Sequence, residues 1–119
     1  MSEPVAFHIG DPWFEHIITG QKIVEGKLAK GKALNMEVGS VLHISGNTGE
    51  VIECRVVAIR RYESFRNYLE TEGLTKSLPG VTSIEDGLNV YNQYYQPGLD
   101  LTLGVLAVEL FFVGHVTTA

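Results

Sequence analysis

The segment EVIECRVVAIRR, residues 50–61, decides the fold. The even-numbered side chains in its middle are apolar: Ile52, Cys54, Val56 and Ala58. Alternate residues of a strand share one face, so this pattern predicts a β-strand with its even positions in a core. Val57 and Ile59 make the second face apolar toward the end of the segment. We therefore expect the strand to become buried on both sides there.

The flanking segments predict a sheet around this strand. GNTG (46–49) has the composition of a turn, so SVLHIS (40–45) is expected to form a hairpin with residues 50–61. The longest apolar run, GVLAVELFFV, predicts a central strand. That run covers residues 104–113, and further strands are expected at residues 5–9 and 22–28.

Helical patterns lie between these strands. Asp11 is expected to cap a first helix that begins at Pro12. A second helix is expected within residues 63–73, and a third after Ser83, whose partner in a capping box is Asp86. The resulting order of elements does not alternate regularly between strand and helix. It predicts an α+β fold, a small curved sheet or partly closed barrel with helices packed outside.

Length and composition limit the classes of protein. The 119 residues suffice for one domain, which we assign to residues 1–113, with residues 114–119 as a flexible tail. The net charge of −5 disfavours bulk attraction to nucleic acid or to an anionic membrane, so any site for a polyanion must be local. No apolar run is long enough to span a membrane, and no signal peptide is recognisable. We expect a soluble cytoplasmic protein with no membrane partner, and the sequence leaves a nuclear location open.

Metal, thiol and nucleotide-loop chemistry have little support in the sequence. Cys54 is the only cysteine and lies in an apolar strand, which favours a buried hydrophobic side chain over a nucleophile. The four histidines show no ligand spacing, and no glycine-rich phosphate loop is present. We therefore predict no metal site and no cofactor.

The segment GQKIVEGKL, residues 20–28, places charges in a predicted strand. Alternation puts Glu25 and Lys27 on one face, and Gly26 between them allows another backbone or a flat ligand to come close. Eight of the nine cations lie between residues 22 and 66. From these residues alone, a solvated face and a local basic cleft both stay open.

Two motifs carry a resemblance to a known family. The pattern G-x-K-x-x-E-x-(R/K) is formed by Gly20, Lys22, Glu25 and Lys27, and a second block reads RYESF, EGL, LPG and two later tyrosines. Over residues 6–110 the chain resembles an ASCH domain, although that family usually has Arg in place of Lys27. The resemblance implies a PUA-like β-barrel of about five to six mixed strands with about two to three flanking helices.

The resemblance also implies a function, the binding of RNA or of a modified nucleoside in a cleft at the Gly20–Lys27 motif. Lys22 would supply a point charge, Glu25 would accept from a base amino group, and Tyr62 would stack on a base. Tyr68, Tyr91 and Tyr95 are expected in the core because of their helical spacing. The expected ligand-binding residues are Trp13, Lys22, Glu25, Lys27, Arg60, Arg61, Tyr62, Ser64 and Tyr94.

Three alternatives to binding alone stay open. Some ASCH-like proteins are amidohydrolases that remove the acetyl group from N4-acetylcytidine with a Lys, a Thr nucleophile and a Glu. Their Lys coincides with Lys22, but Glu25 stands where they have Thr, so Lys22 and Glu25 are catalytic candidates only if the chain is an enzyme. Other relatives are proposed to cut RNA, for which Lys22, Tyr62 and Ser64 would be the candidates. A structural domain without a ligand is the third alternative.

Overall fold

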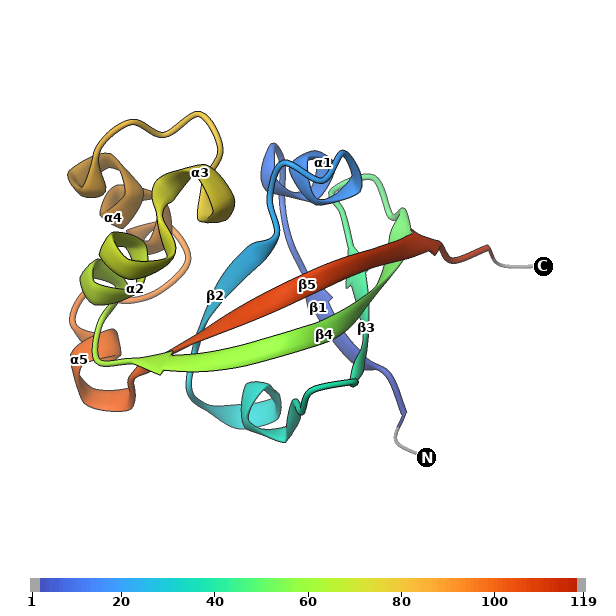
Figure 1. The fold of residues 1–119 in the computed structure, drawn as a ribbon, viewed down its shortest axis with the longest axis horizontal. Coiled ribbons are helices and arrows are strands. Elements are labelled where there is room, and N and C mark those ends of the chain that lie inside the picture. Colours follow the sequence, from blue (N-terminus) through green and yellow to red (C-terminus); the bar gives the residue numbers. More distant parts are fainter. Residues whose placement is uncertain (1–2, 118–119) are drawn as a thin grey trace.

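A computed structural model describes residues 3–117 (Figure 1). Its five strands form one curled sheet in the order β1-β3-β4-β5-β2, with β1 parallel to β3 and the other neighbours antiparallel. The strands are β1 (Val5–His8), β2 (Val24–Leu28), β3 (Val41–Ser45), β4 (Val51–Tyr62) and β5 (Val105–His115). The predicted α+β class and the hairpin of β3 with β4 are confirmed.

The long β4–β5 ribbon is the centre of the sheet. It pairs from Ile52 opposite His115 to Tyr62 opposite Val105, with register shifts along the way that let it bend. Ile52 and Cys54 are fully buried, and burial raises the pKa of the Cys54 thiol to about 12. Cys54 is therefore a buried apolar side chain, as predicted.

Strand β5 extends into the segment that the sequence assigned to the tail. We expected flexible chain from residue 114, but β5 continues through His115, and the Val116 N–H donates to the Val51 carbonyl. Pairing with β4 orders these residues. The end of the predicted tail, residues 118–119, lies outside the described residues.

The curl of the sheet leaves a seam between its two edge strands. Within residues 3–117, β1 and β2 are not paired with each other, so the sheet is a half-barrel. Side chains from β3, β4 and β5 fill its inside. The other face of β2 and β5 packs against helices that gather at one end of the ribbon (Figure 1).

The helices are more numerous than predicted. They are α1 (Trp13–Ile18), α2 (Phe65–Glu72), α3 (Leu74–Ser77), α4 (Ile84–Asn92) and α5 (Leu99–Leu103), with a 3-10 turn η1 (Gly31–Asn35). The side chain of Ser83 accepts from the Asp86 N–H, so the predicted cap of α4 is confirmed. The predicted start of α1 is wrong: Pro12 is at the cap position, and the Asp11 carboxylate accepts from the Asn47 amide instead.

Gly26 sets how closely α2 approaches the sheet. It lies on the helix-facing side of β2, where an added Cβ would be 2.7 Å and 2.8 Å from two ring carbons of Tyr68. The room that we expected at this glycine is therefore taken by a buried tyrosine ring. The absence of a side chain allows the ring to lie on the backbone.

We predict that Gly26→Ala lowers the free energy of unfolding by about 1–3 kcal/mol, because Tyr68 is fully buried and has no room to move. Gly114→Ala is the matched control, since a Cβ there would meet nothing within 4 Å. Urea unfolding followed by circular dichroism measures both. Equal stability of the two variants would contradict the packing described for Tyr68.

Candidate functional site

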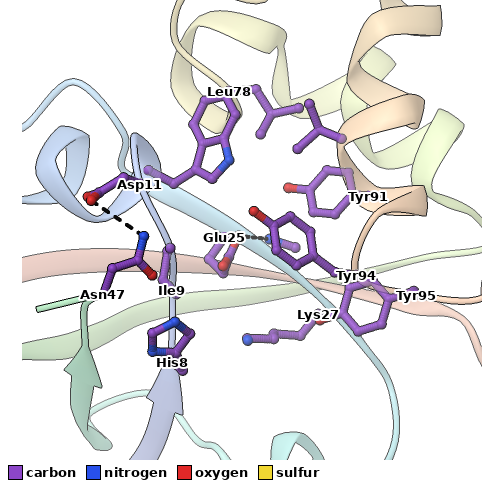
Figure 2. A pocket seen from close by; sticks show the side chains of 14 residues that line it. His8, Ile9, Asp11, Glu25, Lys27, Asn47, Leu78, Tyr91, Tyr94 and Tyr95 are labelled. Carbon is purple, nitrogen blue, oxygen red and sulfur yellow. Dashed lines mark hydrogen bonds between the residues drawn. The ribbon is translucent and has the colours of Figure 1, made fainter. Parts of the chain in front are cut away.

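A cavity of about 280 Å³ opens at the seam of the half-barrel (Figure 2). β1 contributes His8 to it, β2 contributes Glu25 and Lys27, and α1 and α4 contribute side chains from above the sheet. The site thus draws on segments that are far apart in the sequence. It lies where the two edge strands of the sheet fail to meet.

Glu25 provides a carboxylate within the cavity. Strand alternation turns it away from the helix-facing side of β2, and its side chain is 14% exposed. Its Oε1 atom accepts from the Gly26 N–H at 3.1 Å and lies 3.2 Å from Lys22 Nζ. Both contacts engage the same oxygen, which leaves Oε2 as an acceptor for a ligand.

Lys22 lies behind Glu25 and does not line the cavity. Its side chain is fully buried, and its ammonium group donates to the Val24 carbonyl at 2.7 Å and to the Ser77 carbonyl at 2.5 Å. Burial lowers the pKa of Lys22, and the charge of Glu25 opposes that shift. Two carbonyls and one carboxylate match the three donors of an ammonium group. Lys22 is therefore placed to hold Glu25 and to tie β2 to α3.

Aromatic side chains form much of the wall. Trp13 comes from the first turn of α1. Tyr91, Tyr94 and Tyr95 come from α4 and the turn after it (Figure 2). Tyr94 is 55% exposed. The Tyr91 hydroxyl is 2.9 Å from that of Tyr68, and burial raises the pKa of Tyr91, so the phenol stays neutral. The cavity is thus partly apolar and able to receive a flat ring.

The far end of the cavity is polar and was missed by the sequence analysis. Asn47 from the turn between β3 and β4 donates to the Asp11 carboxylate at 3.5 Å, and His8 lies close by in the lining. No short-range pattern marks these residues. They meet because β1 pairs with β3 in parallel, which brings the segments that follow each strand to the same edge.

Tyr91 and Tyr95 also belong to this wall, although their helical spacing predicted only a core role. Tyr91 is buried as expected, yet both rings border the cavity. A side chain that packs on the core with one face can line a cavity with another. Helical periodicity does not distinguish these two environments.

Four of the predicted ligand residues lie away from the cavity: Arg60, Arg61, Tyr62 and Ser64. The Arg60 guanidinium binds Glu72 at 2.6 Å and 2.8 Å, and the Tyr62 hydroxyl donates to the same carboxylate at 2.5 Å. Arg61 donates to the Leu103 carbonyl, and Ser64 caps α2. These polar groups have partners within the fold.

The described part of the chain contains neither a cluster of metal-ligating side chains nor a membrane-spanning helix. Within residues 3–117, no group of three or more His, Cys, Asp and Glu side chains could hold a metal ion. No helix in this range has the length and apolar character needed to cross a bilayer.

Comparisons with known proteins agree with this architecture. The family model described as ASCH domain matches residues 7–110. The crystal structure of hypothetical protein PH0355 is 33% identical, with a TM-score of 0.84 over 93% of this chain and 100% of that one. Protein PF0455 from Pyrococcus furiosus is 37% identical, with a TM-score of 0.76 over 93% of this chain and 98% of that one.

A more distant structure shows the same fold. A mutant of ZmASCH from Zymomonas mobilis is 14% identical, with a TM-score of 0.64 over 94% of this chain and 72% of that one. The comparison with curated proteins gives no match.

We predict that Lys22→Met lowers the free energy of unfolding by about 3–5 kcal/mol, because it leaves two carbonyls without their donor and the largely buried Glu25 carboxylate without its counter-charge. Lys76→Met removes an exposed lysine from the same region and should change stability by less than about 0.5 kcal/mol. Denaturant unfolding compares them. A Lys22→Met variant as stable as Lys76→Met would show that this ammonium group does not hold the strand.

Proposed function

The chain belongs to the ASCH domain family, and we propose that it binds RNA or a modified nucleoside by taking one base into the cavity at the seam. The observation that carries this proposal is the fixed carboxylate of Glu25 among aromatic side chains. A flat apolar wall beside one directed acceptor is suited to a heteroaromatic ring with polar edges.

Stacking supplies the contact that does not depend on base identity. Trp13 and Tyr94 line the cavity from different elements, and every base has a π-face that can stack on such rings. The volume of about 280 Å³ lies near the lower end of the roughly 300–1,000 Å³ range of ligand pockets. A site of this size favours a single base over a larger ligand.

Glu25 supplies selectivity for the edge of the base. An ionised carboxylate only accepts hydrogen bonds, so its Oε2 selects a ring N–H or an exocyclic amine. Lys22 occupies the other oxygen and keeps the carboxylate in one orientation. Asp11 and Asn47 offer acceptors and a donor for ribose hydroxyls, which are the groups that distinguish RNA from DNA.

Deacetylation of N4-acetylcytidine is the second candidate, because Lys22 and Glu25 are in contact beside the cavity. That chemistry in relatives uses a hydroxyl nucleophile. None of the serines and threonines within residues 3–117 lines the cavity. For RNA cleavage the candidates were Lys22, Tyr62 and Ser64, and none of these lines it either. Binding is therefore the function that the geometry supports best.

We predict that nucleosides change the fluorescence of Trp13, which is the only tryptophan. Tyr94→Ala should weaken binding by about 1–3 kcal/mol through lost stacking, without loss of stability, because the ring is 55% exposed. Phe111→Ala, which removes an exposed aromatic ring outside the cavity, is the control and should bind normally. If adenosine, cytidine, guanosine, uridine and N4-acetylcytidine all leave the wild-type fluorescence and NMR spectrum unchanged at low salt, the proposal is wrong.

An incubation with N4-acetylcytidine separates binding from hydrolysis. Binding alone predicts that the nucleoside is recovered intact by chromatography. Release of acetate by the wild-type protein, abolished in Glu25→Gln, would instead establish the second candidate.

A further inference from the structure

A basic hollow continues from the base cavity. It is lined by Phe7, Lys27, Lys30, Lys32 and Tyr95, among others, and it shares Lys27 and Tyr95 with the cavity. The two hollows are therefore neighbours that share two lining side chains. A ligand whose base enters the cavity would have its next covalent group at or near Lys27.

Phe7 holds two of these lysines in place. Lys27 Nζ lies 4.4 Å from the centre of its ring, and Lys32 Nζ lies 4.9 Å from the same point. Cation–π contacts of this kind position an ammonium group without neutralising its charge. Phe7 thus brings together two positive charges that would otherwise repel each other.

Three lysines of this hollow lack an acidic partner. Within residues 3–117, Lys27, Lys30 and Lys32 form no ion pair, whereas Lys22, Arg60 and Arg66 each bind a carboxylate. Arg55, Arg61 and Lys76 are also unpaired in this range, but none of them lines the cavity or this hollow. On a chain with a net charge of −5, half of the six unpaired lysines and arginines thus lie in one hollow beside the cavity.

The positive path extends beyond the three lysines. Lys32 also borders a further hollow that contains Arg55 on β4. The same hollow is lined by Glu3, so its charge is mixed, whereas the hollow beside the cavity has lysines as its only charged lining residues. The best-placed phosphate contacts are therefore the lysines next to the cavity.

We propose that Lys27, Lys30 and Lys32 form a phosphate shelf, and that the ligand is a phosphorylated nucleotide within single-stranded RNA and not a free nucleoside. This inference rests on the proposed function, because it takes the base cavity as its starting point. Lysines bind phosphates as point charges and do not read sequence. The shelf fixes the strand on the protein, and the cavity reads one base.

The test compares cytidine with its 5′-monophosphate and 3′-monophosphate, which differ from it only in phosphate, and with a cytidine tetranucleotide, which also adds further nucleotides; adenosine counterparts are included. Trp13 fluorescence gives each affinity. We expect the wild-type protein to bind the tetranucleotide at least roughly tenfold tighter than the nucleoside at low salt, with a log–log salt slope of about 0.7 per phosphate contacted. If only the 5′- or only the 3′-monophosphate shows part of this gain in affinity, that isomer identifies the direction in which the strand leaves the cavity.

The variant Lys30→Gln/Lys32→Gln should lose most of this gain, measured as the ratio of tetranucleotide to nucleoside affinity, and should show a smaller salt slope. Lys76→Gln, an exposed lysine outside both hollows, is the matched control and should keep the wild-type ratio. An unchanged ratio in the double variant, with nucleoside binding present, overturns the phosphate shelf and leaves the base site standing. No binding of any of these ligands to the wild-type protein overturns both.

Discussion

The buried ammonium group of Lys22 is the contact on which the rest of the site depends. A lone charge in a protein interior is costly, and it is tolerated only where its donors are matched. Here the carbonyls of Val24 and Ser77 and the carboxylate of Glu25 provide that match. One side chain therefore joins the edge strand β2 to α3 and orients the acceptor of the cavity. The fold and the chemistry of the site are fixed by the same group.

The sheet does not close fully, and this leaves the Glu25 carboxylate accessible to a ligand from the cavity. β4 and β5 are long and bend around the core, whereas β1 and β2 are short edge strands that do not pair with each other in the described part of the chain. Helices cover the outer face of β2 (Figure 1). At the seam beside β2, residues of α1 and α4 line the cavity. An unpaired edge strand often promotes aggregation, because its free N–H and C=O groups can pair with another chain. In this protein the open edge provides a cavity with an aromatic wall and a carboxylate, with a lysine-lined hollow beside it.

The sequence predicted those features that depend on local periodicity. The buried face of β4, the hairpin with β3 and the cap of α4 at Ser83 follow from alternation, turn composition and capping chemistry. The short helices α3 and α5 were not predicted, because four or five residues are too few to show a helical period of apolar side chains. The place of Asn47 and Asp11 in the cavity was not predicted, because their contact depends on the parallel pairing of β1 with β3. Arg60 and Tyr62 look like a nucleic-acid motif in the sequence, but a single distant carboxylate, Glu72, binds both.

The central claim is that the seam takes one base, with its ring beside Trp13 and Tyr94 and an N–H group on Glu25. A crystal structure of the protein with a bound cytidine tetranucleotide tests this most directly. We predict one base in the cavity, a hydrogen bond from its edge to Glu25 Oε2, and the backbone phosphates running toward Lys30 and Lys32. An oligonucleotide bound elsewhere, for example over Arg61 and Tyr62, with the cavity unchanged would contradict the account.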